Sequence, residues 1–144
     1  MAIAVDIDGT LADCGHRLQF IKDLPQDWDR FYEAMGRDKV IEPMASMIKD
    51  LYRSNRIILM TGRPEKYRDM TLEWLIRNYI PFTELLMRPD DDHRPDYVLK
   101  SEMLWTAEQM GYEINLAIDD KPAVVQMFLQ RGIVCLQMPE GKTV

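Results

Sequence analysis

Paired acidic residues follow two of the apolar stretches of this chain. Asp6 and Asp8 end the first stretch, in "MAIAVDIDGT", and Asp119 and Asp120 end another, in "LAIDDKP". Such pairs are costly to ionise, because a neighbouring carboxylate disfavours the charged form. A divalent cation relieves this repulsion, and Mg²⁺ prefers oxygen ligands. A single aspartate could be a solvated loop acid, but two pairs at the ends of apolar runs favour a Mg²⁺ site that draws on all four residues.

Short apolar runs alternate along the chain with longer segments of helical period. The runs span residues 2–5, 56–60, 84–87, 114–118 and 133–136. The helical segments span residues 43–53, 64–79, 96–110 and 122–131. This alternation predicts an α/β fold whose central parallel sheet is covered by helices on both faces. Ligands of such folds bind beyond the carboxyl ends of the strands, where the acid pairs and, in "ILMTGRP", Thr61 and Gly62 would meet.

Length and composition narrow the class of protein. The 144 residues, 47% of them hydrophobic, suffice for one folded domain, which we expect to span residues 1–144. We expect residues 13–40 to form a small flap at the mouth of the site, with a short helix that starts near Pro25. The formal charge of −6 argues against a large nonspecific nucleic-acid surface. The two distant cysteines, and the lack of a signal sequence or of an apolar stretch of about 18 residues, predict a cytoplasmic protein without membrane contact.

Four short motifs occur in a definite order between Asp6 and Asp120. They are "DIDGTLAD", "ILMTGRP", Lys100 within "YVLKSEM", and "AIDDKPAVV". In sequence and order they resemble the four motifs of the haloacid dehalogenase (HAD) superfamily of phosphotransferases. The resemblance implies a Rossmann-like HAD fold with three layers, a central parallel sheet and only a small cap.

Within that superfamily the chain is similar, along nearly its whole length, to the 3′-phosphatase domains of bacteriophage polynucleotide kinase/phosphatases. Arg17, Arg63 and Asp96 stand at matching distances from the motifs, and the run "AIDDKPAVVQMFLQRGIVCLQ" matches as well. The match weakens in the flap region. Thr61 stands where those domains have Ser, and Lys121 where they have Arg, so both changes keep the chemical type.

The resemblance implies a role for each acid. Asp6 would attack phosphorus and form an aspartyl-phosphate, while Asp8 would protonate the leaving oxygen and then activate water. A general acid needs a raised pKa, which a neighbouring carboxylate would give to Asp8. The backbone carbonyl of Asp8 would face the metal, Asp119 would bind the metal directly, and Asp120 would support it from the first or second shell of ligands.

Other matched residues would handle the phosphate. Thr61 would donate its hydroxyl to a phosphoryl oxygen, and Gly62 would let the backbone approach. A helix beginning near Pro64 would add the positive end of its dipole. Lys100 would neutralise charge brought by the phosphate and the nucleophile, and Asp96, one helical turn earlier, would orient that lysine.

The arginines would bind the substrate. We expect Arg17 and Arg63 to hold the phosphate or the next nucleotide, because a planar guanidinium suits such anions. His16, an isolated histidine beside the first motif, receives no catalytic role.

Three further features are interpreted as structural. The "DDDH" sequence at residues 90–93 is expected to be a solvated turn, and Trp74 and Trp105, at helical spacing, are expected to lie in the core. The "GKT" sequence at residues 141–143 lacks the upstream glycine of a phosphate-binding P-loop, so we expect no ATP site.

Together these features predict a Mg²⁺-dependent phosphomonoesterase of nucleic-acid repair. Its substrates would be 3′-phosphorylated DNA or RNA ends, or nucleoside 3′-monophosphates, because a small flap leaves the site open to a macromolecular end. One alternative is a small-molecule HAD phosphatase such as a 5′-nucleotidase, with the same chemistry. Another is an inactive module that binds nucleic-acid ends, although such a binder has no need of Asp8.

Overall fold

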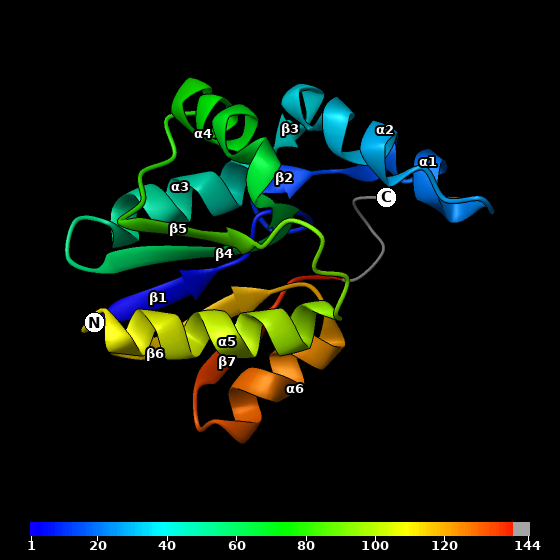
Figure 1. The fold of residues 1–144 in the computed structure, drawn as a ribbon. Helices are drawn as coiled ribbons and strands as arrows, with labels where there is room; N and C mark the ends of the chain where they lie inside the picture. The colour runs from blue at the N-terminus through cyan, green and yellow to red at the C-terminus, as the bar shows by residue number, and fades with distance from the viewer. Residues whose placement is uncertain (140–144) are drawn as a thin grey trace.

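A five-stranded parallel sheet forms the centre of the protein (Figure 1). The computed structural model describes residues 1–139, so the "GKT" sequence lies outside the described residues. Neighbouring strands pair in parallel in the order β5-β4-β1-β6-β7. Their bounds are Ala2–Val5 (β1), Arg56–Pro64 (β4), Glu84–Arg88 (β5), Ile114–Asp119 (β6) and Val134–Gln137 (β7). The predicted α/β class and its parallel sheet are confirmed.

Helices cover both faces of this sheet, as Figure 1 shows. Their bounds are Glu42–Leu51 (α3), Arg68–Arg77 (α4), Asp96–Gln109 (α5) and Pro122–Gln130 (α6). On one face α3 and α4 bury Ile48 and Trp74, and on the other α5 and α6 bury Leu104 and Phe128. Side chains of β1 alternate between these two cores, because successive residues of a strand point to opposite faces. A fully buried side chain of this size contributes about 1.5–3 kcal/mol, so the two cores together fix the strand ends firmly.

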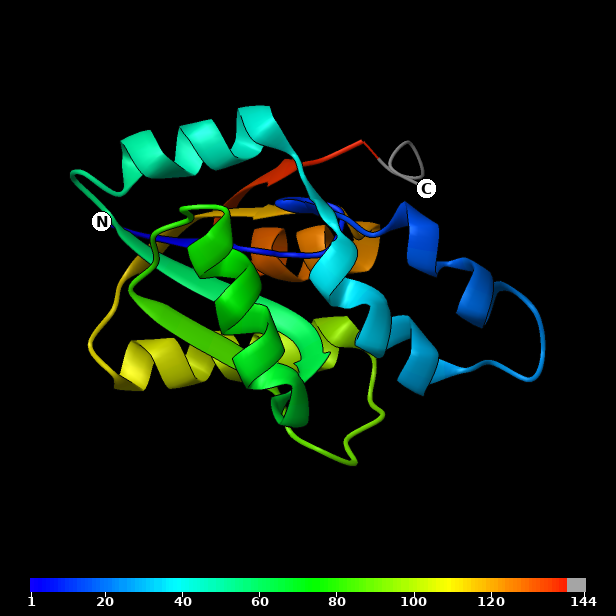
Figure 2. The same cartoon turned by 90° about the horizontal axis from the view of Figure 1, so that it is seen from above.

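The segment between β1 and α3 folds into several short elements. Its base is a two-stranded antiparallel ladder, in which Ala12–Asp13 (β2) pairs with Lys39–Val40 (β3). Between these strands lie Gln19–Lys22 (α1) and Trp28–Glu33 (α2). Figures 1 and 2 both place α1 and α2 beyond the carboxyl ends of the central strands. The segment therefore stands at the edge of the sheet where the acid pairs lie.

The helix expected near Pro25 begins instead at Trp28. Asp27 caps it, because its carboxylate accepts a hydrogen bond from the backbone N–H of Arg30 at 3.1 Å. The cap sets the start of α2 and thereby the direction in which its aromatic side chains project.

The start of the helix after the second motif was predicted incorrectly. β4 continues through Pro64, the 3₁₀ turn Glu65–Tyr67 follows, and α4 begins only at Arg68. Pro64 stays extended because it pairs with Arg88 of β5 after an irregularity in the ladder. The N-terminus of α4 therefore does not follow directly on Thr61 and Gly62.

Trp105 also differs from the prediction. Trp74 is fully buried, but Trp105 lies on the outer face of α5 with 61% of its surface exposed. The inner face of α5 is already filled by Leu104 and its neighbours in the second core. In the described part of the chain, no helix combines the length and the apolar character needed to cross a membrane.

Candidate active site

Three carboxylates from two adjacent strands meet at the carboxyl edge of the sheet. Asp6 directly follows β1, Asp119 ends β6, and Asp120 comes next. One oxygen of each lies within 4.8 Å of the other two. Oδ1 of Asp120 is buried and has no hydrogen-bond partner among residues 1–139. We call this group the acid cluster; its donors are all oxygens, and it fits Mg²⁺, which would satisfy the unpartnered atom.

Lys100 reaches into the acid cluster from α5. Its Nζ donates to Oδ1 of Asp6 at 2.8 Å and to Oδ2 of Asp119 at 2.6 Å, and the side chain is almost completely buried. Burial alone would lower the pKa of Lys100, but the negative charges of Asp119 and Asp6 outweigh it and raise that pKa above its ordinary value. The ammonium group therefore stays charged between the two carboxylates.

The surroundings of the acid cluster disfavour the ionised forms of its carboxyl groups. Burial raises the pKa of Asp6 well above its ordinary value, and the charge of Asp119 raises it further, while Lys100 opposes both. Burial also raises the pKa of Asp120. A bound cation would reverse these shifts, because an opposite charge favours the ionised form of a carboxyl group.

Because Gly9 has no side chain, the carboxylate of Asp120 can occupy the space beside its backbone. A Cβ atom at this position would lie 2.1 Å from Oδ2 of Asp120, and the backbone of Gly9 has a φ of +85°. Both the close approach and the left-handed backbone favour glycine. The turn after β1 can therefore pass directly over the acid cluster.

The side chain of Asp8 lies outside the acid cluster and contacts two arginines. Arg63 donates to it twice, from Nε at 3.1 Å and from Nη2 at 2.7 Å, and Arg17 donates from Nη2 at 2.7 Å. Burial alone would raise the pKa of Asp8, but the charges of Arg63 and Arg17 outweigh it and hold that pKa well below its ordinary value. The raised pKa predicted for Asp8 is therefore wrong in this state, because the nearest charges are guanidiniums and not a carboxylate. The side chain of Asp8 is also not among the clustered metal ligands.

Asp38 completes a buried network with Asp8, Arg17 and Arg63, which we call the arginine–aspartate network. Arg17 donates to Asp38 from Nε at 2.8 Å and from Nη2 at 2.6 Å, and Arg63 donates from Nη2 at 3.4 Å. His16 contacts the same carboxylate at 2.7 Å. Two carboxylates thus balance two guanidiniums. Asp38 could not be found from sequence patterns, because it lies just before the short β3, outside every motif and every periodic segment.

The network also shows the present contacts of the two arginines. The side chains of Arg17 and Arg63 are fully buried, and their expected contact with the phosphate or the next nucleotide stays a prediction. Each guanidinium contacts Asp8, so their direct contact in this structure is with the predicted acid–base residue.

Thr61 and Gly62 lie on β4 at the same edge of the sheet. Oγ1 of Thr61 is buried and accepts a hydrogen bond from the backbone N–H of Arg63 at 3.1 Å. A Cβ atom at Gly62 would lie 2.7 Å from Oδ1 of Asp96. Glycine is therefore required here for the approach of a carboxylate of the protein itself.

Asp96 contacts different residues from those predicted. At the first position of α5 its carboxylate accepts hydrogen bonds from Arg88 and from Lys121. Lys100, which it was expected to orient, bonds to Asp6 and Asp119 instead. The two cations beside the helix start hold Asp96 there and outweigh its i, i+4 relation to Lys100.

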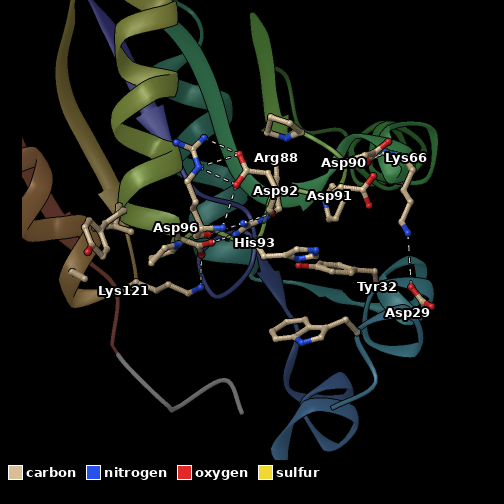
Figure 3. A pocket seen from close by; sticks show the side chains of 18 residues that line it. Asp29, Tyr32, Lys66, Arg88, Asp90, Asp91, Asp92, His93, Asp96 and Lys121 are labelled. Atoms are coloured by element: carbon tan, nitrogen blue, oxygen red, sulfur yellow. Dashed lines mark hydrogen bonds and ion pairs between the residues drawn. The ribbon is translucent and has the colours of Figure 1, made fainter. Parts of the chain in front are cut away.

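A cleft of about 790 Å³ opens beside the acid cluster, and Figure 3 shows the side chains that line it. Asp96 and Lys121 line the cleft, and Lys121 directly follows Asp120 of the acid cluster. Trp28 and Tyr32 of α2 also line it. The "DDDH" turn at residues 90–93 belongs to the same wall, and Asp90, Asp91 and His93 are exposed, as expected for a solvated turn.

Solved structures of HAD-type hydrolases share this fold. One is a HAD family enzyme from Bacteroides thetaiotaomicron in complex with magnesium and inorganic phosphate, with a TM-score of 0.58 and 12% identity. The match covers 98% of this chain and 95% of that one. At this identity the likeness concerns the fold alone, which is that of a HAD hydrolase.

The family model described as "Polynucleotide kinase PNKP phosphatase domain" matches residues 1–142. The chain belongs to this family, and the predicted resemblance is confirmed. It is a HAD-family phosphatase domain of the polynucleotide kinase/phosphatase type.

Two longer proteins are similar to it in sequence. One is named "Putative bifunctional polynucleotide kinase/RNA ligase", from Autographa californica nuclear polyhedrosis virus, and is 28% identical over 130 residues, which are 88% of this chain and 17% of that protein. The other is a chain in the structure of a Pnkp1/Rnl/Hen1 complex, with 29% identity and a TM-score of 0.79, covering 94% of this chain and 45% of that one. The chain thus spans less than half the length of each.

Proposed function

We propose that the protein is a Mg²⁺-dependent phosphomonoesterase that removes the 3′ phosphate from DNA or RNA ends or from nucleoside 3′-monophosphates. The observation that carries this proposal is the acid cluster, with the ammonium group of Lys100 held between Asp6 and Asp119. A carboxylate beside a fixed cation and a cation-binding oxygen set suits attack on a phosphate dianion. The cytoplasmic location predicted from the cysteine content is part of the proposal.

Asp6 is the nucleophile in this proposal. One of its oxygens is bonded to Lys100 at 2.8 Å, and the other is 3.4 Å from the hydroxyl of Thr10. Attack on phosphorus forms an aspartyl-phosphate, and the P–O bond to the nucleoside breaks. Water then cleaves the aspartyl-phosphate and releases inorganic phosphate and free Asp6.

Asp8 is the acid and base of the reaction. In the free protein Arg17 and Arg63 keep it charged. An arriving phosphate dianion is a like charge that shares these guanidiniums, and like charge raises the pKa of a carboxyl group. Asp8 can therefore take up a proton as substrate binds, give it to the leaving 3′ oxygen, and take one back from water in the second step.

The metal would be held by the side chains of Asp6, Asp119 and Asp120, and by the backbone carbonyl of Asp8. When bound, Mg²⁺ supplies Lewis-acid polarisation of the phosphoryl oxygens. The hydroxyl of Thr61 and the backbone of Gly62 would hold the phosphate from the β4 side.

The choice of nucleic-acid ends as substrates rests on the relatives. The name of one similar protein refers to a polynucleotide kinase/RNA ligase, and a second solved structure of the Pnkp1/Rnl/Hen1 assembly, with 27% identity, is described as an RNA repair complex. The cleft beside the acid cluster supports this choice, because its volume of about 790 Å³ has room for a leaving group the size of a nucleoside.

A matched pair of oligonucleotides tests the proposal. The two differ only in whether the 3′ or the 5′ end carries the phosphate, and kcat/KM is measured for each with Mg²⁺ present. We expect the 3′-phosphorylated end to be preferred by at least about tenfold, the effect of one charge-assisted contact. The Asp6→Asn protein controls for a contaminating phosphatase.

Other outcomes of this experiment favour the alternatives. A preference for the 5′ end, or for small nucleotides with the phosphate on the 5′ carbon, favours a 5′-nucleotidase. Tight binding of ends without release of phosphate favours an end-binding module.

A further inference from the structure

Aromatic side chains line the cleft beside the acid cluster. Trp28 and Tyr32 of α2 stack on each other, with ring centroids 6.0 Å apart and an interplanar angle of 29°. Both line the cleft, and Trp28 leaves 45% of its surface exposed. His93 and Tyr97 line the cleft from the loop before α5 and from α5 itself. Figure 3 shows Tyr32 and His93 pointing into the same space.

The cleft adjoins the acid cluster at Lys121. Lys121 lines it, and the backbone N–H of Lys121 donates to Oδ1 of Asp119 at 3.0 Å. A leaving group that extends from the acid cluster past Lys121 would therefore enter the cleft.

The charges that line the cleft nearly balance. Five aspartates, Asp29, Asp90, Asp91, Asp92 and Asp96, line it together with the cations Lys66, Arg88, Arg94 and Lys121. Each of these cations is paired with an acid of the same wall: Lys66 with Asp29, Arg94 with Asp92, and both Arg88 and Lys121 with Asp96. A track for a phosphodiester backbone would instead show excess positive charge. The cleft therefore suits an uncharged part of the substrate better than a second phosphate.

We propose that this cleft binds the nucleobase of the 3′-terminal nucleotide, stacked on the exposed ring of Trp28, which itself packs on Tyr32. The proposal rests on the proposed function and adds which part of the substrate is recognised. The cleft volume of about 790 Å³ lies within the range of small-molecule sites, roughly 300–1,000 Å³. Every base has an aromatic face, so stacking accepts different bases. The protein thus recognises one terminal nucleoside, and nucleotides further from the end contribute little.

The first experiment compares two 3′-phosphorylated oligonucleotides that differ only in whether the terminal nucleotide carries its base. Stacking of one base predicts a kcat/KM about 5- to 150-fold higher for the end with a base. Trp28→Leu and Tyr32→Leu should reduce that preference, while Trp28→Phe, which keeps a ring, should retain most of it. Trp105→Leu and Tyr52→Leu are the matched controls, because both remove an exposed aromatic side chain away from the cleft, and both should keep the preference. An equal kcat/KM for the two ends overturns the proposal.

A binding measurement separates this proposal from the proposed function. Equilibrium dialysis with the Asp6→Asn protein compares adenosine 3′-monophosphate with the same sugar phosphate lacking its base. We expect the nucleotide to bind at least about fivefold more tightly, with the difference lost in Asp6→Asn combined with Trp28→Leu. Equal affinities overturn the base site whatever the wild-type protein hydrolyses. If the difference is present but the wild-type protein releases no 3′ phosphate, the base site stands and the proposed function fails.

Discussion

Replacing Asp38 with asparagine removes one of the two negative charges of the arginine–aspartate network. The Asp38 carboxylate is fully buried and accepts two hydrogen bonds from Arg17. Removing one partner of a buried ion pair costs about 3–5 kcal/mol, because the other charge stays buried without compensation. We expect Asp38→Asn to lower the free energy of unfolding, measured by urea denaturation, by this amount. Because domains typically have about 5–15 kcal/mol, the variant should remain folded. Asp50→Asn, on the exposed side of α3, is the control and should change stability by no more than about 0.5 kcal/mol.

The activity of Asp38→Asn on two different substrates gives a second test. A residue with a purely structural role would not change the ratio of the two activities. Without the charge of Asp38, both guanidiniums act on Asp8 alone, which holds it more firmly in the charged form and makes it a poorer proton donor. The leaving 3′ oxygen of a nucleotide needs that proton, while p-nitrophenolate leaves without it. The ratio of kcat/KM for a 3′-nucleotide to that for p-nitrophenyl phosphate should fall about tenfold or more, a part of the usual contribution of a general acid. Equal losses on both substrates, or an Asp38→Asn protein as stable as the Asp50→Asn control, would refute this reasoning.

Changes at the strand ends have equally definite expected outcomes. Asp6→Asn should abolish turnover with the fold intact by circular dichroism, because an amide cannot attack phosphorus; activity in that protein contradicts the covalent route. EDTA should abolish activity and Mg²⁺ restore it, and Asp119→Ala should raise the Mg²⁺ concentration needed for half-maximal rate; an undiminished rate after chelation contradicts the metal assignment. Gly62→Ala should lower kcat/KM and cost about 1–3 kcal/mol in urea denaturation, because its Cβ would lie 2.7 Å from Oδ1 of Asp96; wild-type values for both would contradict it. The pKa of Asp8 is lower in the folded protein than its unfolded value of about 3.9, so its contribution to stability is complete above about pH 5 and is lost as the pH falls. Unfolding free energies measured at decreasing pH should therefore fall less steeply for Asp8→Asn than for the wild type.

The sheet and the acid cluster could be predicted from the sequence. Short apolar runs separated by helical segments permit little other than a parallel sheet, and the carboxyl ends of parallel strands share one edge. Asp6 and Asp119 therefore had to lie close together although more than a hundred positions separate them. Lys100 was placed only by its position in the order of the motifs, since a lysine on a helix is usually solvated.

The surroundings of Asp8 could not be predicted in the same way. Its pKa depends on Arg63, 55 positions away, and on Arg17, and the sequence did not show that both would contact the same carboxylate. Asp38 lies between short irregular elements, where periodicity carries no information. Asp96 was assigned to Lys100 from helical spacing, but two cations from other elements hold it at the start of α5. Charged side chains thus pair with the opposite charges nearest to them in the folded protein, and local patterns in the sequence do not reveal which these are.

Rapid acid quenching of the wild-type protein tests the central claim most directly. The protein is mixed with Mg²⁺ and an oligonucleotide whose 3′ phosphate is radiolabelled, and the quenched protein is digested and its labelled peptide sequenced. We predict transient label on the peptide that contains Asp6, and no label on the protein from the same oligonucleotide labelled at its 5′ phosphate. Release of labelled 3′ phosphate without label on Asp6, or transfer to the protein from the 5′ end only, would contradict the account.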